Sequence, residues 1–221
     1  MSFDGFGSGT SAFFEELAAN NTRDWWLANK SRYEADVRAP LEYLLADLAD
    51  EFGEAKVFRP NRDTRFSADK TPYKTAAAAV IGDVNGSAST LYVQISADGL
   101  TVGGGCYHPA RDQLTRLREA IAADQTGREL EAIAADLERA SGELASPEQL
   151  KTAPRGYAAD HPRIELLRMK GIVAMFEHPP APWLHTEKAK DTVATDWRVV
   201  GPLNAWLDAN VGPSTLPDPR R

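Results

Sequence analysis

The chain has 221 residues, of which 43% are hydrophobic and 26% charged, the composition of an ordinary globular protein. Its formal net charge of −7 disfavours a protein whose whole surface binds nucleic acid or anionic lipid, but it is compatible with a local basic site. The single cysteine, Cys106, excludes an internal disulfide framework and fits a reducing compartment. No signal peptide follows Met1 and no apolar run could span a bilayer, so we expect a cytoplasmic protein without membrane contact.

The N-terminal half begins with a segment rich in Gly and Ser, residues 1–10, which we expect to be flexible. A short helix is predicted from Ser11, which offers an N-cap. A second helical region is predicted from Thr22 toward Pro40, and leucines at spacings of three and four then indicate one buried face over residues 41–52. Pro40 either kinks this helix or begins a new one.

The centre of the chain changes from the helical period to the period of two that is typical of strands. The dipeptides Asn85-Gly86 and Asp98-Gly99 are turn signals, and the second is of the kind that closes a hairpin. The predicted strands are residues 57–58, 76–81, 91–95 and 100–102. Short connections between consecutive strands favour an antiparallel meander over crossovers.

The helical period returns after Pro109. The predicted elements are two helices with apolar stripes at 114–121 and 130–137, a loop at 147–162, a short helix at 165–170, a strand at 172–176 and a last helical region from Thr186, interrupted at Gly201-Pro202. No repeat and no long linker divides the chain. We therefore predict a single α+β domain over residues 11–211, an antiparallel sheet flanked by helices, with a flexible Pro-rich tail at 212–221.

The most charged stretch is Phe58–Thr75, FRPNRDTRFSADKTPYKT, which we call the basic loop. Its five cations outnumber its two carboxylates, Asp63 and Asp69, in a chain that is negative overall. The paired N–H donors of arginine and the ammonium charge of lysine are well suited to bind phosphate or carboxylate groups. The loop is therefore a candidate binding site for an anionic ligand. The alternative is that carboxylates pair with these cations in a structural ion-pair network.

A glycine run at residues 103–105 follows the last central strand and precedes a predicted helix, an arrangement that can offer backbone N–H groups to an anion. A bulge or a close backbone contact is the alternative reading of such a run. It matches neither a P-loop nor a dinucleotide fingerprint. The full set of candidate ligand-binding residues is Arg59, Arg62, Arg65, Lys70, Tyr73, Lys74, Gly104 and Gly105, and Asp63 and Asp69 are candidate bases or metal ligands.

Other catalytic constellations are not indicated. Cys106 and His108 lie too close along one extended segment to favour a thiol nucleophile, and the four histidines have no recognised metal-ligand spacing. No nucleophile elbow and no kinase motif set is present. The sequence therefore predicts no metal site and indicates no particular cofactor.

Two stretches resemble a known family. The run NNTRDWWLANKSRYEADVRAPLEYLLADL and the basic loop, followed by a strand and GGGCYHP, are similar to the uncharacterised bacterial family catalogued as domain of unknown function 2461. The resemblance covers residues 12–209. It implies a single intracellular α+β domain, and because the family has no assigned catalytic residues it implies none here. Its signature falls on Arg59, Arg62, Asp63, Arg65, Phe66, Asp69, Lys70, Pro72, Tyr73 and Lys74.

Two hypotheses follow, and they leave open whether the protein is an enzyme. The first is a domain that binds an anionic, phosphate-bearing small molecule through the basic loop. The second is a non-enzymatic interaction module in which the same loop binds an acidic protein or a nucleic acid backbone, with its ion pairs mainly structural. The net charge disfavours nucleic acid in general, and the sequence carries no signal for an oligomeric state.

Overall fold

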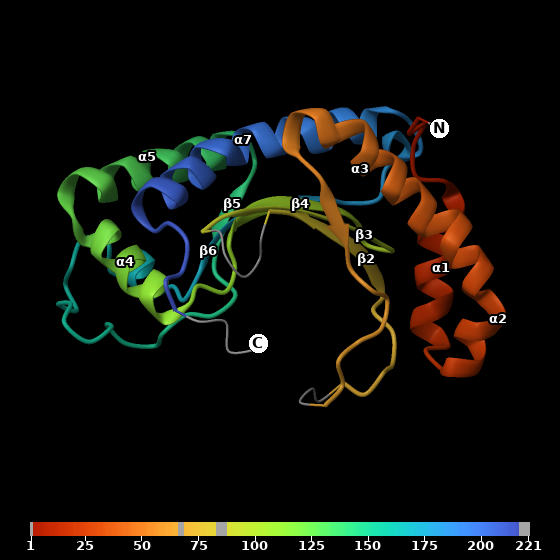
Figure 1. The fold of residues 1–221 in the computed structure, drawn as a ribbon, viewed down its shortest axis with the longest axis horizontal. Helices are drawn as coiled ribbons and strands as arrows, with labels where there is room; N and C mark the ends of the chain where they lie inside the picture. The colour runs from red at the N-terminus through yellow and green to blue at the C-terminus, as the bar shows by residue number, and fades with distance from the viewer. Residues whose placement is uncertain (1, 66–68, 83–87, 217–221) are drawn as a thin grey trace. The chain divides into compact units, whose positions relative to one another are not determined.

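The computed structural model describes residues 2–65, 69–82 and 88–216 (Figure 1). The helices are α1 (Ser8–Ala19), α2 (Arg23–Tyr33), α3 (Ala39–Phe52), α4 (Arg111–Ala122), α5 (Asp124–Arg139), α6 (Ile164–Arg168) and α7 (Lys188–Asn210), with a π-helical turn η1 (Glu34–Arg38) and a 3-10 turn η2 (Pro182–His185). The strands are β1 (Ala55–Val57), β2 (Ala76–Ile81), β3 (Thr90–Ser96), β4 (Gly99–Cys106), β5 (Glu143–Ala145) and β6 (Ile172–His178). The protein is of the α+β class, which confirms the predicted fold class.

The strands form one antiparallel sheet with the order β1-β2-β3-β4-β6-β5. The first four strands follow one another as the predicted meander, and Gly99, at φ +109°, begins β4 directly after the hairpin turn. At the other edge β5 pairs with β6, with Leu144 opposite Ala174. Strand β5 was not predicted from the sequence, because its three residues are too few to show a strand pattern. The predicted turn at Asn85-Gly86 and the signature residue Phe66 lie outside the described residues.

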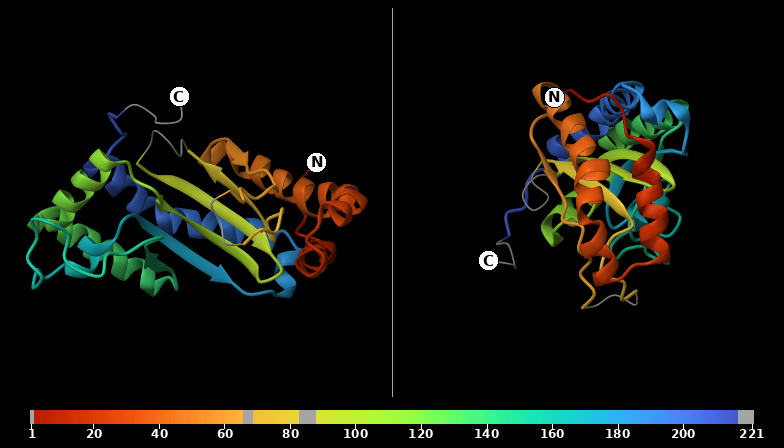
Figure 2. Two further views of the ribbon diagram at one scale, coloured as in Figure 1. Left: turned by 90° about the horizontal axis from the view of Figure 1, so that it is seen from below. Right: turned by 90° about the vertical axis from the view of Figure 1, so that its right-hand side faces the viewer.

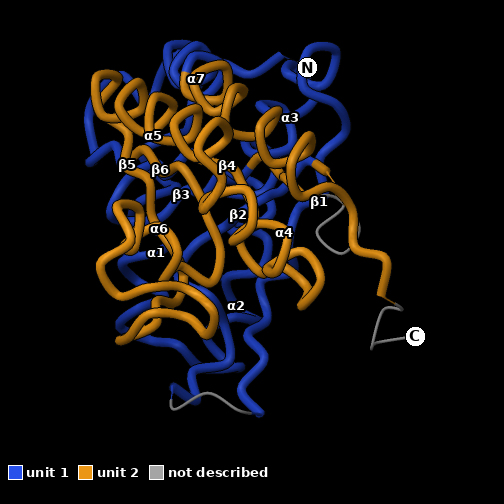
Figure 3. Tube along the Cα trace, turned by 90° about the vertical axis from the view of Figure 1, so that its left-hand side faces the viewer, with its two compact units in different colours: residues 1–81, 92–102, 177–195 blue, residues 82–91, 103–176, 196–221 orange. Residues whose placement is uncertain are grey.

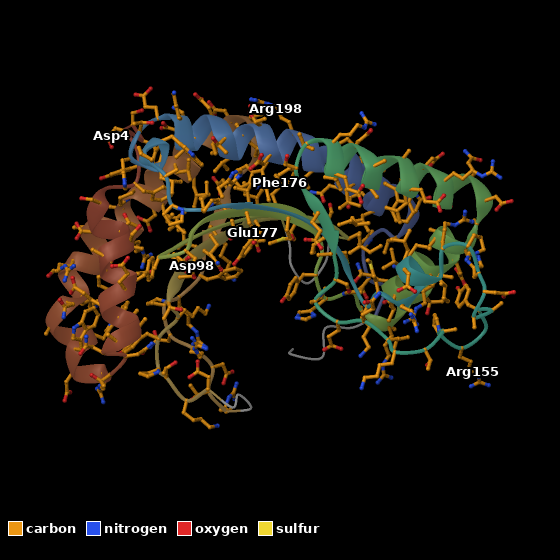
Figure 4. All side chains as sticks on the ribbon, turned by 180° about the vertical axis from the view of Figure 1, so that it is seen from behind. Asp4, Asp98, Arg155, Phe176, Glu177 and Arg198 are labelled. Carbon is orange, nitrogen blue, oxygen red and sulfur yellow. The ribbon has the colours of Figure 1, made fainter. Side chains whose placement is uncertain are left out.

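Strand β3 has one buried side and one partly exposed side, whereas β2 and β4 are buried along nearly their whole length. In β3, Val93 and Ile95 are buried, whereas Tyr92 and Gln94 are half-buried, which is the alternation that the sequence predicts. Phe176 and Glu177 show the same contrast at neighbouring positions of β6, because they point to opposite sides of the strand (Figure 4).

The chain divides into two compact units (Figure 3). Unit 1 comprises residues 1–81, 92–102 and 177–195, and unit 2 comprises residues 82–91, 103–176 and 196–221. Unit 1 contains α1, α2 and the basic loop, and unit 2 contains α4 and α5. The single domain over residues 11–211 stays a prediction.

The N-terminal segment is packed more closely than we expected. Helix α1 begins at Ser8, and the side chains of Phe3 and Phe6 are buried at 1% exposure. The backbone N–H of Phe3 donates to Asp47, and that of Phe6 donates to the carbonyl of Leu184. The Gly and Ser content drew attention away from these two aromatic residues, whose burial holds the segment on unit 1.

The start of the Pro-rich tail is also held in place. Asp112 of α4 accepts hydrogen bonds from the backbone and hydroxyl of Thr215 and from the hydroxyl of Ser214. Arg116 donates to the carbonyls of Val211 and Pro213. Residues 212–216 therefore lie along α4 and are hydrogen-bonded to it, whereas composition suggested a flexible segment.

The two prolines of uncertain effect lie inside helical segments. Pro40 lies in the first turn of α3, directly after η1, where the N–H of Ala39 donates to the carbonyl of Glu34 five residues back. Pro202 lies within α7, so the predicted interruption at Gly201-Pro202 is wrong. The buried side chains of Val200 and Leu203 on either side keep the helix packed across the missing hydrogen bond.

Arg163 joins the end of α4 to the start of α5 within unit 2. Its side chain is 5% exposed, and its guanidinium donates to the carbonyls of Ile121, Ala122 and Ala123. A Cβ on Gly127 would lie 2.4 Å from Arg163 Nε, so the glycine makes room for this contact. The guanidinium thus satisfies helix C-terminal carbonyls that would otherwise be buried without donors.

Replacing this guanidinium should destabilise the protein. We expect Arg163→Met to lower the free energy of unfolding by about 3 kcal/mol, because it removes charge-assisted hydrogen bonds and leaves buried carbonyls unsatisfied. Urea denaturation of Arg139→Met, whose side chain is 76% exposed, gives the control, with an expected change below about 0.5 kcal/mol. Equal losses in the two variants would show that Arg163 has no special role.

Candidate functional site

The basic loop connects β1 to β2 in unit 1 and begins as a continuation of their pairing. The N–H of Phe58 donates to the carbonyl of Ala78, and Asn61 lies opposite Tyr73 in an antiparallel bridge. The N–H groups of Arg62 and Lys74 donate to the carbonyls of Pro72 and Pro60, each at 2.9 Å. The stem of the loop is therefore a narrow two-stranded ribbon that extends away from the strands (Figures 1 and 2).

Tyr73 anchors this stem to the start of α2. Its ring is buried and stacks on Trp26, with centroids 4.2 Å apart and planes 11° from parallel. The side-chain amide of Asn21 accepts from the N–H of Tyr73 at 3.1 Å and donates to its carbonyl at 2.9 Å. Thr22, whose hydroxyl caps α2 by accepting from the N–H of Trp25, fixes this end of the helix. Tyr73, predicted to contact ligand, is thus placed as a structural anchor.

The two hydrogen bonds between the Asn21 amide and the Tyr73 backbone allow a test of how the stem is attached to α2. We expect Asn21→Ala to lower the free energy of unfolding by about 1 to 3 kcal/mol, because two backbone groups of a buried residue lose their partner. Asn20→Ala is the matched control, since the Asn20 amide makes an exposed bond to Glu16. Thermal or urea unfolding compares them, and an Asn21→Ala loss no larger than that of Asn20→Ala would contradict the anchor.

Three cations share the base of the loop: Arg59, Arg62 and Lys74. Partial burial lowers the pKa of Lys74, and the positive charges of Arg59 and Arg62 lower it further. The ammonium lies 5.2 Å from the ring centre of Phe58, a cation-π contact. Among the residues that the structure describes, neither Arg59 nor Lys74 forms an ion pair with a carboxylate. The base is therefore a cluster of like charges in which Arg62 and Lys74 are half-buried and Arg59 is exposed, and we call it the base cluster.

The Arg62 side chain is half-buried, at 29% exposure. Its Nη1 donates to Asp69 Oδ2 at 2.6 Å. Its Nε is buried and has no hydrogen-bond partner within the described part of the chain. Asp69 therefore uses only one of the guanidinium nitrogens, Nη1, and the group keeps hydrogen-bonding capacity for an anion.

The tip of the loop carries the remaining two cations, and both have partners inside the loop. Arg65 forms a bidentate pair with Asp63, at 3.0 Å from Nε and 2.7 Å from Nη2, although its side chain is 77% exposed. Lys70 donates to the carbonyl of Thr64 at 2.8 Å. The ion-pair alternative thus describes the pairs Arg65–Asp63 and Arg62–Asp69, while the base cluster keeps a surplus of positive charge.

The two loop carboxylates have the wrong acidity for general bases. The hydrogen bond from the Arg65 side chain lowers the pKa of Asp63 to about 2. Hydrogen bonds from the backbone and hydroxyl of Thr71 lower the pKa of Asp69, and Arg62 adds to the effect. A base works best when its pKa lies near the working pH, so both are poor proton acceptors at neutral pH. Among the described residues, no group of three or more potential ligands could hold a metal ion.

The glycines predicted to assist the loop lie in unit 2 and belong to strand β4. Gly104 and Gly105 are buried, and a Cβ would lie 2.5 Å from the carbonyl of Thr90 or 2.4 Å from that of Ile172 respectively. Gly105 also has φ +127°, which L side chains rarely adopt. These features fit the close backbone contact that was the alternative reading of the run, and α4 begins only at Arg111.

Cys106, at the end of the same strand, does not have the environment of a nucleophile. Burial raises the pKa of its thiol to about 11, and the charge of Asp208 adds to the shift. The thiolate is the reactive form, so this cysteine stays protonated and inert at neutral pH.

Three residues of the site escaped the sequence interpretation: Asn21, Trp26 and Phe58. Asn21 directly precedes the predicted helical region from Thr22, and Trp26 lies within it, but neither position indicated a contact with the basic loop. Their contacts with the loop join positions 47 to 52 residues apart, which no local pattern reveals. A signal did exist in the adjacent tryptophans Trp25 and Trp26, which follow the capping Thr22 by three and four residues.

The fold and the loop together define an α+β protein with a cationic ribbon between the edge strand β1 and its neighbour β2. The family model described as conserved hypothetical protein (DUF2461) matches residues 9–206, which is most of the chain and includes the whole basic loop. The chain belongs to this family. Comparison with curated proteins and with solved structures gave no match. No helix in the described residues has the length and apolar character needed to cross a membrane.

Proposed function

We propose that the protein binds an anionic, phosphate-bearing small molecule at the base cluster. The observation that supports this most is the set of three cations, Arg59, Arg62 and Lys74, in which burial and then the charges of the two arginines lower the pKa of Lys74, while one ion pair, between Arg62 and Asp69, offsets part of the positive charge. Uncompensated, partly buried like charges destabilise a fold and are found preferentially at functional sites.

A phosphate group suits this arrangement chemically. It offers three acceptor oxygens and up to two negative charges, which match the donors of two guanidinium groups and one ammonium. The Arg62 side chain is 29% exposed, and Lys74, whose ammonium contacts the Phe58 ring, is close enough for the charge of Arg62 to lower its pKa. Binding would relieve the repulsion within the base cluster, so the anion would stabilise the folded protein.

The first prediction concerns ligand stabilisation. A panel of nucleotides, sugar phosphates and polyphosphate should include compounds that raise the melting temperature, since a ligand at 100 times its Kd adds about 2.7 kcal/mol. We expect the shift to disappear in the double variant Arg62→Ala, Lys74→Ala. Lys56→Ala, an exposed lysine on β1, is the control and should retain it. Equal shifts in the double variant and the wild type would refute the site.

The second prediction concerns pH. The lowered pKa of Lys74 means that its charge is lost at a lower pH than that of an ordinary lysine, and only the charged form attracts an anion. Affinity for sulfate, which keeps its charge across this range, should be full at neutral pH and fall as the pH rises through the pKa of Lys74. The fall should vanish in Lys74→Arg, because arginine stays charged. Calorimetric titrations at several pH values measure it, and identical profiles for both proteins would contradict the role of Lys74.

The alternative function is binding to an acidic protein or a nucleic acid backbone. The exposure of Arg59 and Arg65 on a ribbon that extends away from the strands favours it, since small-molecule sites are usually concave. Binding to nucleic acid would weaken steeply with salt, as counterions are released. Absence of binding to single- or double-stranded oligonucleotides at low ionic strength would remove the nucleic-acid version of this alternative, and loss of binding in Arg65→Ala would place the contact at the tip.

A further inference from the structure

Asp69 occupies an anion position at the base cluster. Its Oδ2 accepts from Arg62 Nη1 at 2.6 Å, which is the geometry that a ligand oxygen would adopt. Its Oδ1 is engaged separately, by the N–H of Thr71 at 2.9 Å and the hydroxyl of Thr71 at 2.8 Å. The carboxylate therefore has two independent attachments, and only one of them involves Arg62.

This division lets Asp69 leave Arg62 without becoming unpaired. The bonds to Thr71 are local, two residues along the chain, and the side chain of Asp69 is 47% exposed, so water can solvate the released oxygen. The cost of release is then about that of one charge-assisted hydrogen bond. A buried and fully paired carboxylate could not exchange so easily.

We propose that Asp69 holds, in the free protein, the place at Arg62 that the anionic group of the ligand takes, and that the ligand binds by displacing it. This inference rests on the proposed function and adds a requirement on the ligand. A carboxylate from solution makes the same hydrogen bond to Arg62 that Asp69 already makes, and it must also pay the entropy cost of association. It therefore does not displace Asp69 efficiently. A phosphate ester dianion contacts Arg62 and the other two cations together, so it displaces Asp69.

Asp63 provides the matched comparison. It is the other carboxylate of the loop and is equally exposed, at 47%, but it pairs with Arg65 at the tip and makes no hydrogen bond to the base cluster in the described structure. Asp63→Asn and Asp69→Asn make the same change of charge and size. Asn at position 69 keeps an oxygen for Thr71 but can present an amide donor toward Arg62, which frees the guanidinium.

The experiment titrates sulfate and acetate into the wild type, Asp69→Asn, Asp63→Asn and the double variant Arg62→Ala, Lys74→Ala, at constant ionic strength. NMR shifts of the backbone amides of the loop report weak binding. We expect Asp69→Asn to tighten sulfate about tenfold, the factor that follows from one charge-assisted hydrogen bond of about 1.4 kcal/mol. Acetate should tighten by the same factor, because displacement of Asp69 is the same step for both anions. Asp63→Asn should change either affinity by less than about threefold.

Each other outcome overturns the inference in a recognisable way. If Asp69→Asn gains no more than Asp63→Asn, Asp69 does not compete for Arg62. If the gain for sulfate is the square of the gain for acetate, Asp69 stays in place and merely repels in proportion to charge. In both cases wild-type sulfate binding that disappears in the double variant leaves the proposed function standing. If sulfate binds none of the four proteins, the proposed function fails and the inference fails with it.

Discussion

The stack of Tyr73 on Trp26, with the Asn21 amide closed around the Tyr73 backbone, is the contact on which the site depends. A narrow ribbon that continues the pairing of the edge strand β1 with β2 has little apolar surface of its own and would not hold a fixed path. By burying one ring of the ribbon against α2, the protein fixes the residue that directly precedes Lys74. The bridge between Asn61 and Tyr73 then places Arg62 on the opposite side of the same stem. The positions of the cations are thus set by an aromatic contact and a backbone ladder.

That anchoring explains how like charges persist close together. Arg62 is 29% exposed and Lys74 is half-buried, and the lowered pKa of Lys74 records the cost of its burial first and of the two neighbouring arginine charges second. Asp69 offsets part of the repulsion, and Asp63 pairs with Arg65 at the exposed tip while its charge also acts on Arg59. The loop is therefore neither a pure ion-pair network nor an open set of cations. Its tip carries a bidentate pair, and its surplus of positive charge lies at the base.

Much of the fold could be predicted because local patterns carried it. The alternation in β3, the Asp98-Gly99 hairpin, the leucine stripe of α3 and the capping glycine Gly53, at φ +96°, each reflect rules that act within a few residues. Elsewhere tertiary packing overrode composition. The buried rings of Phe3 and Phe6 hold the start of the chain, hydrogen bonds to α4 hold Ser214 and Thr215, and buried neighbours carry α7 through Pro202.

The site was predictable in composition but not in arrangement. The sequence located the basic loop and both alternatives for its charges, yet the division into a paired tip and a base cluster depends on which side chains the ribbon brings together. Asp63 and Asp69 look alike in sequence, and only the structure separates them by partner. Gly104 and Gly105 show a second limit. The sequence of a glycine run is the same whether the run binds an anion or allows neighbouring strands to approach closely, so only the structure distinguishes the two roles.

The most direct test of the account is an NMR titration that observes the arginine side-chain Nε–H groups while sulfate is added. We predict that the Arg62 and Arg59 signals move and saturate together, because both guanidinium groups contact the anion. The signal of Arg139, which pairs with Asp136 on exposed α5, should stay in place. If the Arg62 signal does not move, or if it drifts without saturation at the same rate as that of Arg139, the base cluster is not an anion site.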